Sequence, residues 1–150
     1  VITGQLGYLA GQTPTDLGVH NGRLKPPSLT PNSVSSQANL YPDNPQMVYA
    51  QVAPFEYTGD GKAAMVRLAA IVRAMPRTTL IKDAPDYLYA QCSTRLLRFT
   101  DDLEFYLDEP AGVIQVRSAS RLGRSDFGVN RTRVEALRRQ FERSTVSLQK

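Results

Sequence analysis

Apolar and polar residues alternate along two neighbouring segments in the second half of the chain. In residues 87–94, Leu88, Ala90 and Cys92 fall on one side, and tyrosine or glutamine side chains fall on the other. Residues 97–107 repeat the alternation, with mostly apolar side chains at the odd positions. A period of two is typical of a half-buried strand, so the pattern predicts two strands here.

A third strand is predicted to return beside the second. Asp108-Glu-Pro-Ala-Gly112 has the composition of a hairpin turn, and residues 113–121 again carry apolar side chains, Ile114 and Val116, at alternate positions. Matching these two residues to the apolar face of residues 97–107 leaves two registers. A slip by one residue is excluded because it would turn the whole apolar set to solvent.

Either register places one acid among apolar side chains. Asp101 occupies an odd position of residues 97–107 and therefore faces Ser118 or Ser120 in the returning strand. A carboxylate on a partly apolar face is a candidate acid or base and a reason to look for a substrate there. The alternative is structural, with Asp101 accepting hydrogen bonds from these serines or from backbone amides of the following loop.

Other polar residues cluster around the same hairpin and the loop after it. On the polar face, the two registers set Arg117 across from Asp102 or Glu104, which suits an ion pair. Residues 121–131 lead into a helix N-terminus, where backbone amides and arginines can receive a phosphate, sulfate or carboxylate. The candidate ligand-binding residues are Asp101, Asp102, Glu104, Arg117, Ser118, Ser120, Arg121, Asp126, Asn130 and Arg131.

Two segments have the period of an amphipathic helix. Residues 62–75 place a set of apolar side chains on one face, and Pro76 ends the segment. A final helix is expected to begin with Asn130 as its N-cap and to bury one narrow apolar stripe. The stripe consists of Val134, Leu137 and Phe141, and the arginines expected to be exposed are Arg131, Arg138 and Arg139.

Together these elements predict an α+β fold. We expect a two-layer sandwich in which an antiparallel sheet of about four to five strands, one of them within residues 51–57, packs against two helices. Residues 11–46 hold six of the ten prolines and show no sustained period. Residues 1–46 are therefore expected to form an extended proline-rich arm or linker that docks on a single domain of residues 47–150.

Composition excludes several classes of protein. Cys92 is the only cysteine and His20 the only histidine, so neither an internal disulfide nor a Cys/His metal site can form. No metal and no cofactor is expected. The sequence contains no run of 18 apolar residues that would span a bilayer. Because the chain starts at Val1, we expect a removed upstream segment, with residues 1–10 either the end of an anchor or a mobile tail.

Positive charge is concentrated near the C-terminus. Residues 117–150 contain nine Lys or Arg against three acids, in a chain whose formal net charge is +4. These basic residues either pair with the acids of residues 101–109 within the same fold or contact an anionic membrane surface. Nucleic acid is not expected as a partner, because no recognised module and no interleaved aromatic residues accompany the arginines.

Six motifs carry a resemblance to a known family. They are Gly18-Val-His-Asn-Gly-Arg-Leu, Pro31-Asn-Ser-Val-Ser-Ser-Gln, Tyr87-Leu-Tyr-Ala, Phe99-Thr-Asp-Asp-Leu-Glu-Phe, Arg117-Ser-Ala-Ser-Arg-Leu-Gly and Ser125-Asp-Phe-Gly-Val-Asn-Arg-Thr-Arg-Val-Glu. In order and spacing they resemble the domain-of-unknown-function family fourteen ninety-nine, found in bacterial envelope proteins and in plastids. The resemblance covers about residues 17–142. The family has no general assigned activity, and its members look like anchored or exported proteins, which implies a periplasmic location or a membrane-anchored one facing the periplasm.

The arm departs from the pattern of that family. Many members have cysteines there, whereas this chain has Pro27 and Ser33 at the corresponding positions. Thiol, disulfide or metal chemistry of the arm in such relatives therefore cannot operate in this chain.

Two functions remain open from the sequence. The first is a non-enzymatic, envelope-associated binding or accessory module that holds a small anionic ligand or an envelope protein at the hairpin and the following loop. The second is an enzyme for an anionic small molecule, with Asp101 or Asp102 as acid or base and Arg117 and Arg121 as electrostatic stabilisers. Carboxylates that border a pocket would favour a ligand or a reaction, whereas carboxylates covered by the arm would favour structure.

Overall fold

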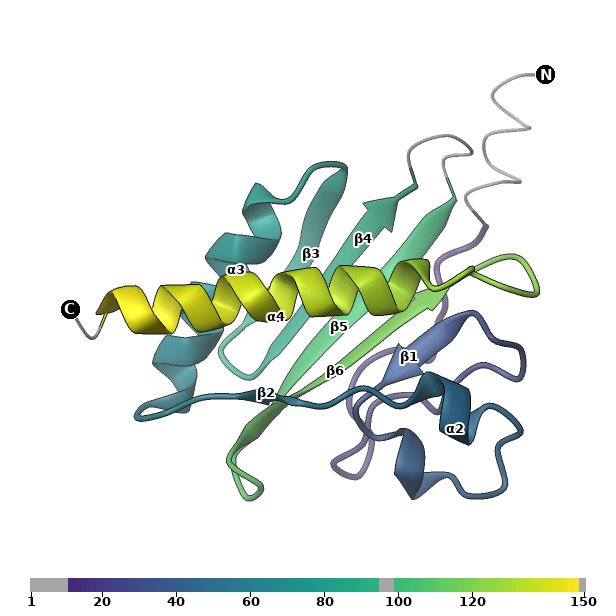
Figure 1. The fold of residues 1–150 in the computed structure, drawn as a ribbon, viewed down its shortest axis with the longest axis horizontal. Coiled ribbons are helices and arrows are strands. Elements are labelled where there is room, and N and C mark those ends of the chain that lie inside the picture. The colour runs from purple at the N-terminus through teal and green to yellow at the C-terminus, as the bar shows by residue number, and fades with distance from the viewer. Residues whose placement is uncertain (1–10, 95–98, 149–150) are drawn as a thin grey trace.

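The fold is built on a six-stranded antiparallel sheet (Figure 1). The computed structural model describes residues 11–94 and 99–148, with side chains described to residue 145. Along the sheet the strands are β1 (Ser33–Ser35), β6 (Val113–Ser120), β5 (Thr100–Asp108), β4 (Tyr87–Ser93) and β3 (Thr78–Ala84), and the short β2 (Phe55–Glu56) also pairs with β6. The helical elements are η1 (Ala38–Leu40), α2 (Met47–Ala50), α3 (Gly61–Ala74) and α4 (Val129–Leu148).

Strands β5 and β6 form the predicted hairpin at the centre of the sheet. Phe105 pairs with Val116 and Asp101 pairs with Ser120, which is one of the two registers that the alternation allowed. The turn closes at Gly112, whose φ of 70° is a left-handed conformation that glycine adopts without strain. The predicted hairpin is confirmed, and it places successive side chains of β5 on opposite faces of the sheet.

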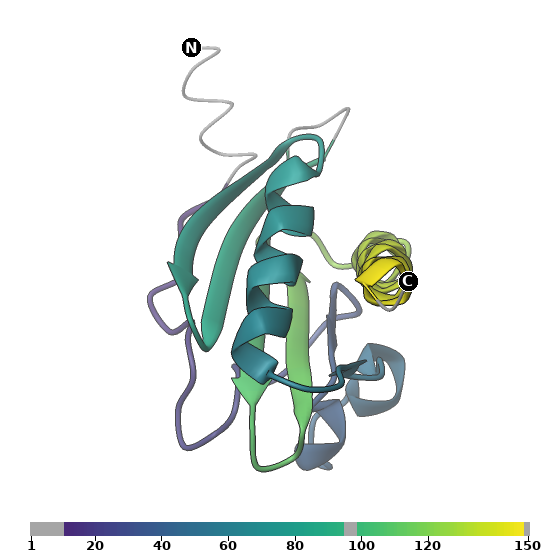
Figure 2. The ribbon, with the colours of Figure 1, turned by 90° about the vertical axis from the view of Figure 1, so that its left-hand side faces the viewer.

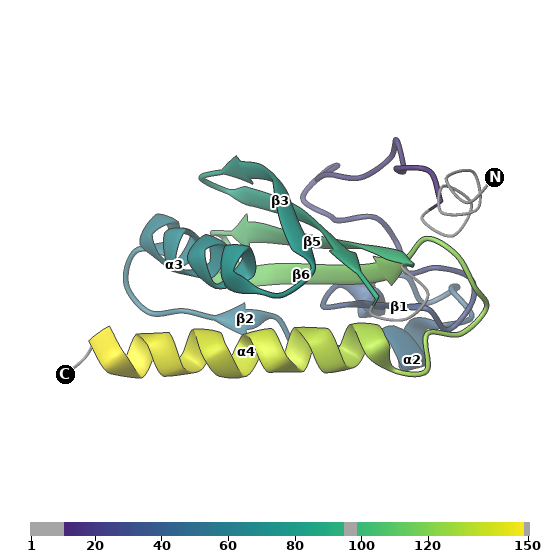
Figure 3. The same ribbon diagram turned by 90° about the horizontal axis from the view of Figure 1, so that it is seen from above.

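Helices α3 and α4 cover the same face of the sheet (Figures 2 and 3). Helix α3 begins after Asp60, whose carboxylate accepts a hydrogen bond from the backbone N–H of Lys62, as an N-cap residue does. The apolar core lies between the two helices and the sheet. At its centre the Phe55 ring lies 5.3 Å from the ring of Phe105 and 5.8 Å from that of Phe141, so β2, β5 and α4 meet there.

Part of the opposite face of the sheet is covered by residues 11–32, which we call the arm (Figure 3). The arm contains no helix and no strand beyond an isolated bridge between His20 and Arg23. Polar contacts hold it in place. The Gln37 side chain accepts a hydrogen bond from the backbone N–H of Leu24 and donates one to the carbonyl of Gly22. The sheet therefore has helices on one side and irregular chain over part of the other, while the edge strand β3 stays mostly exposed.

The structure corrects the predicted number of strands. The sheet has six strands rather than four to five, because β1 and β3 gave no recognisable pattern in the sequence. Within residues 51–57, only Phe55–Glu56 is a strand. Strand β1 lies inside the segment expected to be an arm, so that part of residues 1–46 belongs to the sheet. The expectations for residues 1–10 lie outside the described residues.

Helix α4 also differs from the prediction. It begins at Val129, so Asn130 lies inside the first turn and is not the N-cap. Gly128 precedes the helix, and the carboxylate of Asp126 supplies the capping contacts, because it accepts hydrogen bonds from the backbone N–H groups of Gly128 and Asn130. Two of the arginines expected to be exposed, Arg131 and Arg138, are half-buried and donate to backbone carbonyls of residues 49–54.

Candidate functional site

The candidate residues divide between the two faces of the central hairpin. Because side chains alternate along β5, Asp101 faces the helices while Asp102 and Glu104 face the arm. All three carboxylates are buried, so each requires hydrogen bonds or a counter-ion. They find these partners in different layers of the fold.

On the arm side, Asp102 joins a tyrosine to an arginine across three strands. Its carboxylate accepts a hydrogen bond of 2.5 Å from the hydroxyl of Tyr89 and two of 2.9 Å from Nε and Nη2 of Arg121. This two-point contact is the strong geometry of an arginine–carboxylate pair. The hydrogen bond to Asp102 raises the pKa of Arg121, and burial, followed by the bond to Asp102, raises the pKa of Tyr89.

Glu104 repeats the arrangement two residues further along β5. It accepts hydrogen bonds of 2.6 Å from the Tyr87 hydroxyl and 2.8 Å from the backbone N–H of Gly18 in the arm. Nη1 of Arg117 lies 4.0 Å from Oε1 of Glu104, and Nε and Nη2 of Arg117 donate to the carbonyl of Pro26. Burial lowers the pKa of Arg117 although Glu104 opposes this, and burial together with Glu104 raises the pKa of Tyr87.

The six residues of these two sets lie on the arm side of the sheet, and we call them the arm-side ladder. Among them, Glu104 and Arg117 form hydrogen bonds with the arm. They are Tyr87, Tyr89, Asp102, Glu104, Arg117 and Arg121. Glu104 is fully covered, and Asp102 is nearly so. Each carboxylate of the ladder faces an arginine and accepts a tyrosine hydroxyl, as expected of a structural network, and Oε1 of Glu104 has only Arg117 near it, at 4.0 Å, and no hydrogen-bond donor among the described residues.

On the helix side, Asp101 is paired with Arg133 of α4. Nη2 of Arg133 lies 2.7 Å from Oδ2 of Asp101, and its Nη1 donates to Oδ1 of Asn130 and Oγ of Ser118. Among the described residues, Oδ1 of Asp101 has no hydrogen-bond donor. A fully buried carboxylate oxygen without a donor is rare in proteins, so this atom requires an explanation.

Asn130 connects this pair to the loop before α4. Its Nδ2 donates to Oγ of Ser120 and Oδ2 of Asp126, both at 2.9 Å. Oδ1 of Asp126 accepts a hydrogen bond of 2.5 Å from the Tyr49 hydroxyl. Burial alone would raise the pKa of Asp126, but the hydrogen bonds from Tyr49, Asn130 and two backbone amides together outweigh it and lower the pKa.

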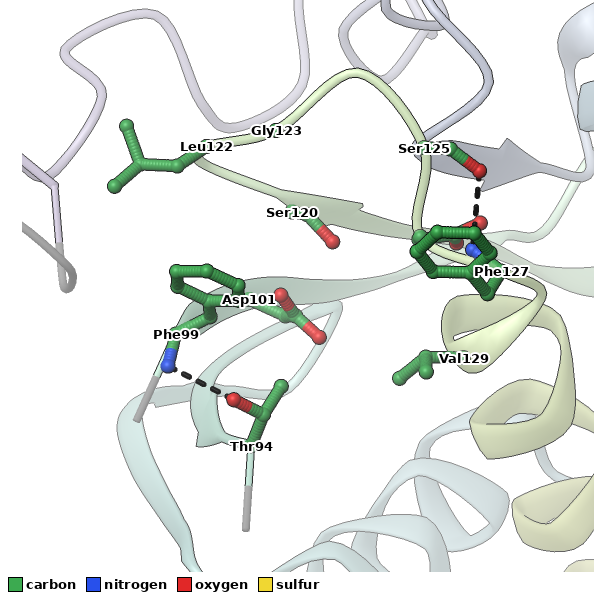
Figure 4. Close-up of a pocket in the computed structure, with 10 residues that line it drawn as sticks. Thr94, Phe99, Asp101, Ser120, Leu122, Gly123, Ser125, Phe127 and Val129 are labelled. Carbon is green, nitrogen blue, oxygen red and sulfur yellow. Dashed lines mark hydrogen bonds between the residues drawn. The ribbon is translucent and has the colours of Figure 1, made fainter. Parts of the chain in front are cut away.

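A pocket of about 440 Å³ opens between the end of the hairpin and this loop (Figure 4). Its walls are mainly apolar, with side chains of Phe99, Leu122, Phe127 and Val129. Phe127 is 94% exposed and has a φ of 50°, which is an uncommon conformation for an aromatic residue. Asp101, Ser120 and Asp126 provide polar groups to the lining. An apolar cavity with a few polar groups is the usual form of a small-molecule site.

A second, smaller pocket of about 190 Å³ lies on the arm side. It is polar, and its lining includes three cations: Lys25 of the arm, Arg117 of β6 and Arg121, which directly follows β6. Asp102 and Asn32 also contribute to this lining, and Lys25 additionally pairs with Asp16 at 2.9 Å.

The structure therefore separates the predicted site residues. Asp101, Ser120 and Asp126 border the apolar pocket, whereas Asp102, Arg117, Ser120 and Arg121 border the polar one. Glu104 lies beneath the arm, Ser118 and Asn130 belong to the network of Arg133, and Arg131 binds the carbonyls of Tyr49 and Gln51.

Several residues of these networks and of the apolar pocket were not predicted from the sequence. Arg133 is one helical turn from Asn130, a spacing that could have indicated a shared face once the helix was placed. Tyr87 and Tyr89 occupy the polar face of a predicted strand and could have been proposed as partners for the acids. Phe99 and Phe127 carry no signal of a pocket, since a single aromatic residue is as common in a core.

The described residues contain neither a metal site nor a membrane-crossing helix. Within residues 11–94 and 99–148, no three His, Cys, Asp or Glu residues come together in a way that could hold a metal ion. In the same part of the chain, none of the helices has both the length and the apolar character that crossing a bilayer requires.

Comparison with known proteins identifies the family. A family model described as a protein of unknown function, DUF1499, matches residues 23–141. The chain belongs to this family. The match confirms the resemblance carried by the six motifs, and both pockets are lined largely by residues of the DUF1499 region. No curated protein and no solved structure gives a significant match to this DUF1499 chain.

Proposed function

We propose that this DUF1499 chain is a binding module that holds an amphiphilic small molecule in the apolar pocket beside Asp101. The single observation that supports it is an apolar pocket bordered by a buried carboxylate, one oxygen of which has no donor among the described residues. The pocket volume of about 440 Å³ lies within the range of roughly 300–1,000 Å³ for small-molecule sites. Exposed Phe127 at its edge gives an incoming apolar group a first surface to contact.

Binding explains the arrangement better than acid–base catalysis does. Asp102 borders the polar pocket, but both of its oxygens already accept hydrogen bonds, from Tyr89 and Arg121. Asp101 borders the apolar pocket, but one of its oxygens is fixed by Arg133. A general base also needs a reacting group within hydrogen-bond reach and a second group that stabilises the developing charge. Apart from Asp101, the charged lining consists of Asp126, which is itself a carboxylate.

The test is a titration of the 15N-labelled chain with a panel of octyl compounds, octylamine, 1-octanol and octanoate, followed by amide chemical shifts. Binding is expected to shift the amides of Phe99, Ser120 and Val129. Val129→Trp should fill the pocket and remove the shifts. Val66→Trp, at an exposed valine on α3, is the matched control and should leave them unchanged. Absence of saturable shifts with every compound would refute the proposal.

A small anion in the polar pocket is a second candidate function. It is favoured by the convergence of Lys25, Arg117 and Arg121 on a space of about 190 Å³, which suits a phosphate or carboxylate group. Calorimetric titration with inorganic phosphate should then give saturable heat that Lys25→Met abolishes, whereas Lys62→Met on α3 should not change it. The candidate fails if phosphate gives no heat or if both variants bind it equally.

We also propose that the protein acts in the cell envelope, facing the periplasm. The support is the family resemblance to anchored or exported proteins. Osmotic shock and membrane fractionation of cells that express the natural protein should place it with periplasmic or membrane markers. Recovery with a cytosolic marker would refute this location.

A further inference from the structure

The apolar pocket has an uneven distribution of charge around it. Its two ionisable lining residues, Asp101 and Asp126, are both carboxylates. Arg133 compensates Asp101, and both oxygens of Asp126 accept hydrogen bonds, from Tyr49 and Gly128 on one side and from Asn130 on the other. Arg131 lies further back, over the ring of Tyr49. The charged side chains in the lining itself are thus both acidic, which favours a cation over an anion.

The polar atom left for a ligand is a hydrogen-bond acceptor. Oδ1 of Asp101 has no donor among the described residues, and Asp101 is 0% exposed, so bulk water does not compensate it. Ser120, the cross-strand partner of Asp101, borders the same pocket, and its hydroxyl accepts a hydrogen bond from Asn130. A hydroxyl oxygen has a second lone pair, so Ser120 can accept one more hydrogen bond.

We infer that the ligand of this pocket is an apolar molecule with a protonated primary amine, whose N–H groups bind the free oxygen of Asp101 and the hydroxyl of Ser120. This rests on the proposed binding function and specifies its ligand class. A primary ammonium group offers three N–H donors and one positive charge, which matches one unpaired acceptor, one hydroxyl and a lining whose charged side chains are both acidic. The apolar walls at Phe99, Leu122 and Val129 take the hydrocarbon part.

The same geometry disfavours anionic head groups at this pocket. A carboxylate or phosphate would bring its oxygens against Asp101 and Asp126 with no free donor among the lining side chains other than hydroxyl groups. Like charges at short distance in a buried site repel strongly. An anionic ligand of this protein would therefore bind in the polar pocket on the other face.

The inference is tested by head-group comparison at a constant octyl chain, using the wild-type protein and the same amide shifts. Octylamine at pH 7 should bind at least about tenfold more tightly than octanoate, the change expected for gaining one charge-assisted hydrogen bond. Octyltrimethylammonium has the charge but no N–H donor, so it should bind more weakly than octylamine. Equal affinity of these two cations would overturn the role of the hydrogen bond, and tighter binding of octanoate would overturn the whole inference.

Two neighbouring residues provide matched variants. Asp101→Asn should remove the preference for octylamine over octanoate, while Asp102→Asn should retain it, although both residues are buried and paired with an arginine. Retention of the preference in Asp101→Asn would contradict the inference. If either variant does not fold, the relative affinities of the three octyl compounds for the wild-type chain still test the inference. If no octyl compound binds, the proposed binding function itself is refuted. Binding without a preference for octylamine refutes only the ligand class, so the two outcomes are distinguishable.

Discussion

Removal of the guanidinium of Arg133 is the most informative perturbation of the fold. Arg133→Met keeps much of the length of the side chain but leaves Asp101 without its counter-ion. The side chain of Asp101 is 0% exposed and that of Arg133 is 10% exposed, so solvent does not replace the lost contact. Arg133 also donates to Asn130 and Ser118, which would lose a charged partner in the same substitution.

The cost can be estimated in two independent ways. Breaking a buried ion pair from one side costs about 3–5 kcal/mol, because an uncompensated charge stays in the interior. A buried carboxyl group can avoid this by taking up a proton, which at pH 7 costs about 4 kcal/mol for an ordinary aspartic acid. The two estimates agree, so the free energy of unfolding should fall by about 3–4 kcal/mol. For a chain of 150 residues this lowers Tm by about 10 °C.

Urea unfolding followed by circular dichroism at pH 7 measures this loss. Arg73→Met is the matched control, because Arg73 pairs with Asp83 in a contact whose side chains are 55% and 43% exposed. An exposed pair contributes about 0–1 kcal/mol, so the control should be nearly neutral. Adding Asp101→Asn to Arg133→Met should restore at least about 1 kcal/mol. The reasoning is refuted if Arg133→Met costs no more than Arg73→Met, or if the second substitution adds to the loss.

Three further predictions concern titratable groups. Because the folded pKa of Asp126 lies below the unfolded value of about 3.9, its ionised form contributes stability above about pH 4 that is lost as pH falls through the folded pKa. The stability gap between wild type and Asp126→Asn should therefore narrow in urea titrations below pH 4, and a constant gap would contradict this. Tyr87, whose pKa is raised by burial and by Glu104, should not ionise while the chain is folded, so Tyr87→Phe should lower the absorbance at 295 nm near pH 11 only in denaturant. Burial raises the pKa of the Cys92 thiol, so its reaction with Ellman's reagent should be slower by orders of magnitude than in unfolded chain, and rapid modification of the folded protein would be inconsistent with the structure.

The central hairpin could be predicted because its signal is physical and local. One face of β5 and β6 is buried against helices, so alternation and register follow from keeping that face apolar. Strand β3 is an edge strand with mostly exposed side chains and an irregularity between Leu80 and Lys82, so no alternation marks it. Strand β1 is three residues long, and two of them are buried serines, so the sequence shows no run of apolar residues that would predict a strand there. Its pairing with β6 decides its conformation.

The site was only partly predictable for a related reason. Strand register is enough to bring Asp101 beside a serine, and the structure has this contact with Ser120. The partner of the carboxylate, Arg133, depends on where α4 docks, and helix periodicity does not determine that position. The same docking turns Arg131 and Arg138 toward backbone carbonyls instead of solvent. Arginines on an amphipathic helix therefore cannot be assigned to a ligand before their backbone acceptors are known.

The two adjacent acids of β5 show how one strand can serve two purposes. Asp102 faces the arm, and its contacts with Tyr89 and Arg121 satisfy both of its oxygens, so it links β4 to the end of β6. Asp101, one residue earlier, faces a pocket and has one oxygen left without a donor among the described residues. Both residues are aspartates, and they are almost equally buried in the structure. An oxygen without a donor does not by itself mark a ligand-binding carboxylate, since Oε1 of Glu104 also has none, but that atom faces Arg117 on the arm side. Asp101 combines such an oxygen with a place in the wall of the apolar pocket, and this combination makes it the position where a ligand gains most.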